Sequence, residues 1–329
     1  MASLMGGVSR QAHTATFPPD RYYCLLDELP LHLVPRRSRA ALRPTAVGKD
    51  LFLNPSCTLL SGDDLPSAMA TERKCVERFA LQGTIAWIRD ARSRSFQPFW
   101  LGPEFEKIVR GLRIDEPVSS SVREITCSIL KAAGVLVERE ECAQEDGMTT
   151  ASAMFRERGY APLTELIHPF HVAALRRYYR HLIRNGKVPL GDNQSSLRYA
   201  IHNEPVARFF HQQLSFALSA IAGEPLKPSY VYLASYLGGA ELKKHTDREQ
   251  CEFSITLCLD FSPEPELATP WPIRLDTKKG TVTVYQALGD GLAYRGTQLP
   301  HYRDRLGAGQ TSTSIFFHYV SEGFSGSLT

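Results

Sequence analysis

Two histidines and one aspartate in this chain have the types and spacing of metal ligands. His245 and Asp247 are separated by one residue, and His301 follows 54 residues after Asp247. Two imidazoles and one carboxylate can occupy one face of an octahedral ferrous ion and leave its other positions open. Such a ligand set suits a mononuclear non-haem iron that needs free positions for a chelating cosubstrate and for dioxygen. The chemistry that this pattern indicates is oxidative.

The spacing of these residues requires strands to position them. In a β-strand residues i and i+2 face the same side, so His245 and Asp247 can reach one ion if their stretch is extended, whereas His301 must come from another segment. Alternating apolar and polar residues predict strands at 229–236, 251–261, 271–275, 281–286, 292–295, 299–303 and 311–320. Short strands at this density indicate a sandwich or jelly roll rather than a βαβ fold.

Helices are expected before these strands. Apolar residues at helical spacing predict helices at 72–89, 104–112 and 119–133, another that begins at Pro169, and one at 204–222. The chain then divides into a disordered leader (1–16), a mainly helical N-terminal region (17–150) and the domain that carries the candidate ligands (151–329). The fold class expected is α+β.

Four stretches around the candidate ligands carry a family resemblance. They are 230–239 leading into His245, then 253–260, 289–304 and 312–320. With these in order, residues 160–320 resemble the Fe(II)- and 2-oxoglutarate-dependent oxygenases, closest to their prolyl-hydroxylase-like branch. The resemblance implies a double-stranded β-helix that holds iron at its mouth through His245, Asp247 and His301, with the helices after Pro169 supporting one sheet. It also implies 2-oxoglutarate and dioxygen as cosubstrates, with ascorbate as a further reductant.

The family usually holds the distal carboxylate of 2-oxoglutarate with a cation and a hydroxyl on the last core strand, because a buried anion needs a charge-assisted partner. This chain departs from that pattern, since residues 310–314 are Gln, Thr, Ser, Thr and Ser. The cation must come from elsewhere. Arg303, which shares a strand face with His301, and Arg305 are favoured, with Arg295 as a third candidate. The alternative for each is a surface arginine that pairs with a nearby aspartate.

Two further residues are expected beside the cosubstrate. Thr313 is the expected hydroxyl on the last strand. Tyr236, nine residues before His245, matches the place of a tyrosine near the cosubstrate in prolyl-hydroxylase-like enzymes. Its alternative role is that of a core aromatic residue whose hydroxyl is bonded elsewhere.

The carboxylate ligand bears on the reaction. Halogenases of this superfamily replace it with a small residue, so Asp247 argues against halogenation. The resemblance implies oxidation of an unactivated C–H bond, by hydroxylation, desaturation or oxidative cyclisation, with release of succinate and CO2. The expected substrate is a small, anionic, carboxylated or amino-acid-derived metabolite of specialised metabolism. The alternative is hydroxylation of a protein or peptide side chain; an open groove beside His245 favours a peptide, and an enclosed pocket lined by arginines favours a small acid.

The net charge and the cysteine content of the chain bear on its binding partners and on its cellular compartment. A net charge of +3 over 329 residues is too mild to indicate nucleic acid as a partner. The sequence has no apolar run of about 18 residues, so it does not predict a membrane-spanning helix.

Seven cysteines, an odd number without a C-x-x-C pair, predict free thiols in the cytoplasm or another reducing compartment. Organellar targeting by the leader is the alternative, because no acidic residue precedes Asp20. Oligomeric state is not indicated by the sequence.

Overall fold

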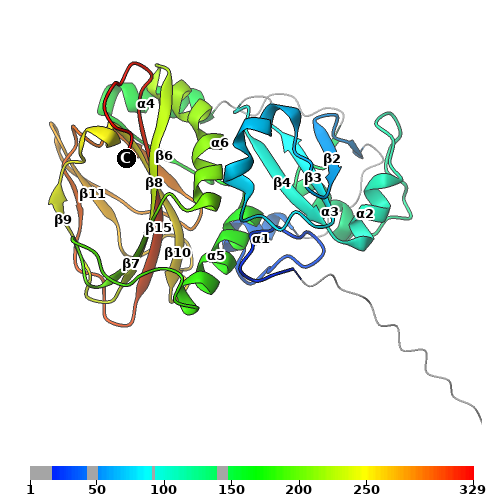
Figure 1. Cartoon of the computed structure of the whole chain (residues 1–329), viewed down its shortest axis with the longest axis horizontal. Coiled ribbons are helices and arrows are strands. Elements are labelled where there is room, and N and C mark those ends of the chain that lie inside the picture. The colour runs from blue at the N-terminus through cyan, green and yellow to red at the C-terminus, as the bar shows by residue number, and fades with distance from the viewer. Residues whose placement is uncertain (1–16, 43–50, 91–92, 139–146) are drawn as a thin grey trace, which may run out of the picture.

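In the computed structural model, the described residues are 17–42, 51–90, 93–138 and 147–329, so the predicted leader lies outside them (Figure 1). Among the helices of these residues, none has the length and apolar character needed to cross a membrane. The cysteines within these ranges are free thiols, and Cys142 falls outside.

Two antiparallel sheets form the half of the molecule that carries the candidate ligands (Figure 1). The six-stranded sheet has the order β6 (Tyr160–Leu163), β13 (Gly291–Tyr294), β10 (Phe253–Ser262), β15 (Thr311–Ser321), β8 (Leu226–Leu237) and β7 (Arg198–His202). The four-stranded sheet has the order β12 (Gly280–Val284), β11 (Ile273–Thr277), β14 (His301–Arg303) and β9 (Leu242–His245). Aromatic side chains join the sheets: the Tyr294 ring lies 4.8 Å from that of His301, measured between centroids.

Side chains alternate between the two faces of the six-stranded sheet, and apolar residues pack on both faces. On β15, Ile315 and Phe317 pack into the main core, whereas Phe316 packs with residues between the two sheets. Helices α5 (Pro169–Arg184) and α6 (Pro205–Ala222) begin with proline, whose missing N–H costs no hydrogen bond in the first turn. They contact β10, β8 and β15, which confirms the prediction that these helices support one sheet.

The strands predicted around the candidate ligands are confirmed, with boundaries within three residues of those expected. The prediction missed β6 and β7. Strand β7 is short and its sequence, Arg-Tyr-Ala-Ile-His, has charged or polar residues at both ends, so its alternation is weak. Its position at the edge of the sheet explains why it tolerates them.

The N-terminal region at 17–150, which was expected to be mainly helical, also contains five short strands within its described residues. Strands β2 (Cys57–Ser61), β3 (Thr84–Arg89) and β4 (Phe96–Leu101) form one antiparallel sheet, and β1 (Leu51–Leu53) pairs with β5 (Leu136–Glu138). The helices are α1 (Arg36–Ala41), the 3-10 helix η1 (Ser67–Val76), α2 (Pro103–Arg110), α3 (Glu124–Ala132) and α4 (Gly147–Arg158).

The helix predicted at 72–89 is wrong in its second half. Gly83 takes a positive φ of 82°, which interrupts a helix and suits glycine. The next residues include Ile85, Trp87 and Ile88, and β-branched and aromatic side chains favour strands. They form β3, which pairs with β4. Pairing with β4 makes this segment a strand, and the spacing of residues within the segment does not reveal that partner.

The predicted boundary between residues 150 and 151 falls inside α4, which packs against α6 and β6. The polar composition of this stretch favoured a turn. Ala151 and Phe155 are nevertheless buried on one side of the helix. The division of the chain into two domains stays a prediction.

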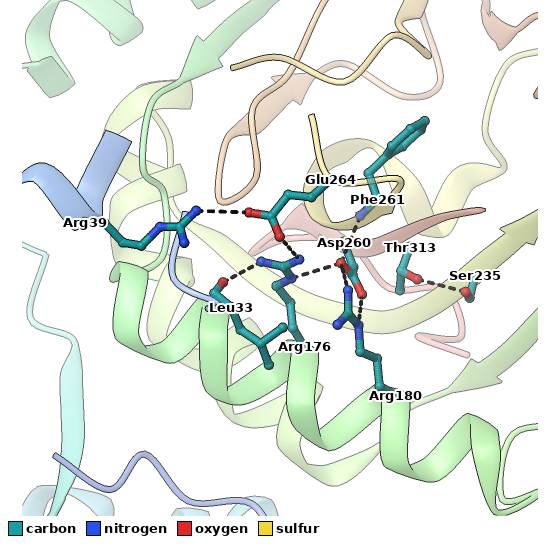
Figure 2. A network of polar contacts seen from close by, with 9 residues as sticks. All are labelled: Leu33, Arg39, Arg176, Arg180, Ser235, Asp260, Phe261, Glu264 and Thr313. Carbon is teal, nitrogen blue, oxygen red and sulfur yellow. Dashed lines mark hydrogen bonds and ion pairs between the residues drawn. The ribbon is translucent and has the colours of Figure 1, made fainter. Parts of the chain in front are cut away.

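A network of ion pairs ties the N-terminal segment to α5 and β10 (Figure 2). The Arg176 side chain is 0% exposed; its Nε donates to Asp260 Oδ1 at 2.9 Å and its Nη2 to Glu264 Oε2 at 3.0 Å. Its Nη1 donates to the Leu33 carbonyl. Arg180, one turn along α5 and 34% exposed, donates to both oxygens of Asp260. Arg176 is therefore the buried centre of the network.

We predict that Arg176→Gln lowers the free energy of unfolding by about 3 kcal/mol, because two carboxylates then lose their buried cation. Arg180→Gln is the matched control and is expected to cost at most about 1 kcal/mol, because its guanidinium is partly in water. Urea unfolding of the three proteins measures both values. Equal losses in the two variants would show that Arg176 is not the centre of this network.

His211 joins α6 to the last strand. Its Nε2 donates to the His318 carbonyl on β15 at 2.7 Å, and the Tyr319 hydroxyl donates to the His211 carbonyl at 2.8 Å. Burial lowers the pKa of His211 to about 3, so the ring is neutral in the folded protein at neutral pH. Unfolding returns it to water, where its pKa is about 6.5.

The stability that His211 contributes is therefore fully present above pH 6.5 and is lost as the pH falls toward 3. The unfolded state binds one more proton in this window, so unfolding free energy is expected to fall by about 1.4 kcal/mol per pH unit for this group. His211→Gln keeps an N–H donor but does not titrate. Urea unfolding at pH 7, 6 and 5 should give a shallower pH dependence for the variant, and an unchanged dependence would contradict the assignment.

Candidate metal centre

The three candidate ligands converge on one point although they come from distant segments. His245 ends β9 and His301 begins β14, and these two residues stand opposite each other in the antiparallel pair. Asp247 follows β9, and its Oδ1 lies 3.6 Å from Nε2 of each histidine. The side chains of His301 and Asp247 are 3% and 11% exposed and that of His245 is 35% exposed, so the site opens to solvent on the His245 side.

Backbone carbonyls orient both imidazoles. His245 Nδ1 lies 2.7 Å from the Lys243 carbonyl, and His301 Nδ1 lies 3.0 Å from the Leu299 carbonyl. A carbonyl can only accept, so each Nδ1 carries the proton and each Nε2 keeps its lone pair. Both lone pairs are thus on the ring nitrogens that approach Asp247. Metal-binding histidines show this arrangement.

Two neighbours position the carboxylate of Asp247. The Ser254 hydroxyl on β10 donates to Oδ2 at 3.0 Å, and the Asp247 backbone N–H donates to the Gly296 carbonyl at 2.9 Å. A Cβ atom on Gly296 would overlap the carboxylate and the Cys251 carbonyl. Ser254 has one proton, so the His318 Nδ1 at 2.9 Å must donate to the Ser254 oxygen. Burial lowers the pKa of His318 to about 4, so that ring is neutral.

The protonation states of the trio also suit a metal. Burial lowers the pKa of His301, which favours the neutral ligand form. Burial opposes the ionisation of Asp247, but its contact with His245 and the proximity of His301 hold its pKa below the usual value. The same carboxylate raises the pKa of His245. A cation at this point would find an ionised carboxylate and two imidazole lone pairs.

A second group with ligand atoms within 4.8 Å of one another shares Asp247 and adds Cys251 and His318. Burial raises the pKa of the Cys251 thiol to about 12, so it is protonated. The Tyr230 hydroxyl lies 3.0 Å from its sulfur. Metal binding needs a thiolate, so this group is the poorer candidate. Cys251 and Cys258 are both buried, as the sequence predicts for small apolar side chains.

We predict that Ser254→Ala weakens metal binding about tenfold, because the carboxylate loses the hydrogen bond that orients it. Thr256→Val is the matched control: this inward hydroxyl is two residues along β10 and contacts Tyr294 rather than a ligand. Competition with a chromophoric chelator for Zn²⁺ measures the affinities. Equal affinities for Ser254→Ala and the control would rule out the role of Ser254.

Two of the residues expected at the cosubstrate lie between the sheets. Arg303 is buried, and its guanidinium donates to the Trp271 carbonyl at 2.5 Å and to Gln286 Oε1 at 3.1 Å. Its Nε has no partner, and no carboxylate pairs with it in the described part of the chain. Burial lowers the pKa of Arg303. Tyr236 is also buried, with its ring 5.1 Å from that of Trp271.

The structure does not bring the other expected residues to this place. Thr313 lies on the face of β15 that α5 covers, where it donates to Ser235 at 2.8 Å (Figure 2). The alternation of β15 instead turns Ser312 and Ser314 inward, so Thr313 does not face the candidate ligands. Arg305 is exposed on the connection to β15, and Arg295 lies over the ring of Phe253 at 5.0 Å.

Sequence reasoning missed Arg198, which faces Tyr236 in the pairing of β7 with β8. This guanidinium is buried and donates to the Tyr236 hydroxyl at 3.2 Å and to Asp192 at 2.7 Å. Burial opposes the ionisation of Asp192, but hydrogen bonds from Arg198 and Tyr232 lower its pKa to about 2. The alternation Arg198, Ala200, His202 was the available signal, and it required the recognition of β7 as a strand.

No protein-family model matches the chain. No curated protein matches it either. Among solved structures, the non-haem alpha-ketoglutarate-dependent epimerase SnoN from nogalamycin biosynthesis is similar with a TM-score of 0.45 and 13% identity, over 53% of this chain and 82% of SnoN.

Two other solved structures are similar over the same share of the chain. A prolyl-4-hydroxylase from Pseudomonas putida has a TM-score of 0.45 and 15% identity, over 54% of this chain and 100% of its own. HygX from Streptomyces hygroscopicus, solved with nickel, 2-oxoglutarate and hygromycin B bound, has a TM-score of 0.43 and 12% identity, over 53% of this chain and 88% of HygX. These values describe a partial likeness, so the chemistry of this chain is inferred from its own side chains.

Proposed function

We propose that this chain is a non-haem oxygenase that uses Fe(II), 2-oxoglutarate and dioxygen. The observation that carries the proposal is the convergence of His245, Asp247 and His301, with both Nε2 atoms 3.6 Å from one carboxylate oxygen. Two imidazoles and one carboxylate with open positions are the ligand set of non-haem ferrous oxygenases. The side opened by the partial exposure of His245 is where a substrate would approach.

The order of the strands supports a double-stranded β-helix. Along the chain, β8, β10, β13 and β15 belong to the six-stranded sheet, and β9, β11 with β12, and β14 fall between them in the four-stranded sheet. The chain therefore crosses repeatedly from one sheet to the other, as in a jelly roll. His245 and His301 come from the four-stranded sheet, and Asp247 lies on the crossing from β9 to β10.

The hydrogen bonds around the candidate ligands orient the two imidazoles and the carboxylate. The carbonyls of Lys243 and Leu299 hold the two Nε2 lone pairs toward Asp247, and Ser254 fixes the carboxylate. When bound, the ferrous ion with 2-oxoglutarate and dioxygen would supply the oxidising power for a C–H bond, with release of succinate and CO2. The buried surroundings of His301 and Asp247 exclude water from the side opposite the opening.

Arg303 is the proposed anchor for the distal carboxylate of 2-oxoglutarate. It is the buried arginine without a carboxylate partner, whereas Arg176 and Arg198 each have one within the described ranges. A buried guanidinium of this kind is stabilised when an anion arrives. Arg303 lies two residues from His301, and Tyr236 is close enough to act on the pKa of Arg303; both neighbours support Arg303 as the anchor.

We predict that Arg303→Gln raises the Kd for 2-oxoglutarate at least about tenfold, because a charge-assisted pair is lost. Binding of 2-oxopentanoate, which has a methyl group in place of the distal carboxylate, should change little. Arg305→Gln, an exposed arginine on the adjoining connection, is the control. Loss of affinity for both keto acids would indicate general damage, and an unchanged preference for 2-oxoglutarate would exclude Arg303 as the anchor.

The proposed substrate is a small anionic metabolite. Arg248, which directly follows Asp247 and forms no ion pair with any residue that the structure describes, supports an anionic substrate. The reaction on it is hydroxylation, desaturation or oxidative cyclisation, which the ligand set does not separate. Hydroxylation of a protein or peptide side chain stays the alternative, and the partial exposure of His245 is the observation in its favour.

Cosubstrate turnover tests the proposed function without knowledge of the substrate. Succinate is measured with Fe(II), 2-oxoglutarate and dioxygen and without added substrate. We predict succinate formation that requires both Fe(II) and dioxygen and that falls to background in His301→Ala, because the ferrous ion loses a ligand. Thr256→Val should retain it. Succinate formation that persists in His301→Ala at the wild-type rate would contradict the proposal.

A further inference from the structure

Five rings form a continuous layer on the inner face of the six-stranded sheet. We call this layer the aromatic wall, and its residues are His202, Tyr230, Tyr232, Phe316 and His318. Ring centroids are 4.4 Å apart for His202 and Tyr232, 4.7 Å for Tyr230 and His318, and 5.9 Å for Tyr232 and Phe316. The residues come from β7, β8 and β15, which are neighbours in the sheet.

The wall runs from the candidate ligands to solvent. At one end His318 contacts Ser254, which in turn donates to Asp247. At the other end Tyr232 is partly exposed and His202 is exposed. The wall therefore offers aromatic surface at its solvent end, and its other end reaches Asp247 through His318 and Ser254.

Two guanidiniums lie against the wall and differ in their partners. Arg198 lies 5.3 Å from the Tyr232 ring, and its charge is balanced by Asp192. Arg248 follows the ligand Asp247 directly; its Cζ lies 4.7 Å from the centre of the Tyr230 ring, and its Nε donates to the Tyr230 hydroxyl at 3.3 Å. Arg248 is exposed and forms no ion pair with any residue that the structure describes.

We propose that the aromatic wall and Arg248 bind the substrate, and that the substrate is an aromatic acid whose ring stacks on Tyr232 and His202 while its carboxylate pairs with Arg248. This proposal rests on the proposed function and narrows its substrate class. Offset stacking of rings and a charge-assisted hydrogen bond to a guanidinium are the two interactions that this surface offers. They would hold a planar anion beside His245, on the open side of the metal ligands.

Three matched probes separate the two interactions. They are 4-hydroxyphenylacetate, cyclohexylacetate, which keeps the charge but lacks an aromatic ring, and 4-hydroxyphenethyl alcohol, which keeps the ring but lacks the charge. Saturation-transfer difference NMR is recorded on the full chain with Zn²⁺ in place of iron and with 2-oxoglutarate present, so that no turnover occurs. The aromatic acid is expected to bind at least about tenfold more tightly than either of the other two.

Substitutions test which residues cause the preference for the aromatic acid over the other two probes. Arg248→Gln should bring the aromatic acid to the affinity of the uncharged phenol, and Tyr232→Leu should bring it to that of cyclohexylacetate. Arg113→Gln, an exposed arginine of the N-terminal region, is the control and should bind like the wild type. The affinities for Zn²⁺ and 2-oxoglutarate, measured on the same samples, are expected to stay unchanged in all variants.

The outcomes distinguish the two proposals. Normal binding of Zn²⁺ and 2-oxoglutarate together with no preference for the aromatic acid would overturn the wall as its binding site and leave the proposed function standing. A preference that persists in both Arg248→Gln and Tyr232→Leu would also overturn it. Failure of the wild type to bind Zn²⁺ and 2-oxoglutarate would overturn the proposed function, and the substrate proposal with it.

Discussion

The site depends on one strand pairing. Strand β9 runs beside β14 so that His245 stands opposite His301, and this register brings two imidazoles together from segments more than fifty residues apart. A slip of one residue would turn one imidazole to the other face of its sheet. Asp247 then reaches the same point because the chain leaves β9 at once and passes Gly296, where no side chain stands in its way. The long α5 and α6 helices serve this geometry indirectly, by covering the far face of the opposing sheet.

Charge inside the molecule follows a second constraint. A guanidinium removed from water needs an anion, and Arg176 and Arg198 obtain one from Asp260 and Asp192. Arg303 has only a carbonyl and an amide oxygen. The contrast separates arginines that hold the fold together from one that is available to a ligand. At the surface beside the aromatic wall, Arg248 likewise has no carboxylate partner among the described residues, whereas Arg198 pairs with Asp192.

Strands with clear alternation, such as β10 and β15, could be predicted from the sequence, because a period-two pattern is a local property. The convergence of His245, Asp247 and His301 was also expected, and the structure brings the three side chains together. Side-chain direction is less robust: Thr313 was expected at the cosubstrate, but Ser312 and Ser314 face inward instead. Arg198 was missed because its short strand is recognisable only beside β8. The helix predicted through β3 failed for the same reason, since pairing with β4 outweighs helical spacing. Contacts between segments distant in sequence decide these cases.

The most direct test of the metal and cosubstrate assignment is an anaerobic absorption titration of the metal-free chain with Fe(II) and then 2-oxoglutarate. A keto acid that chelates ferrous iron gives a weak metal-to-ligand charge-transfer band in the visible range. The account predicts that this band appears with one equivalent of iron in the wild type and is absent in His301→Ala. Iron bound at one equivalent with no band on addition of 2-oxoglutarate, or a band of full intensity in His301→Ala, would contradict it.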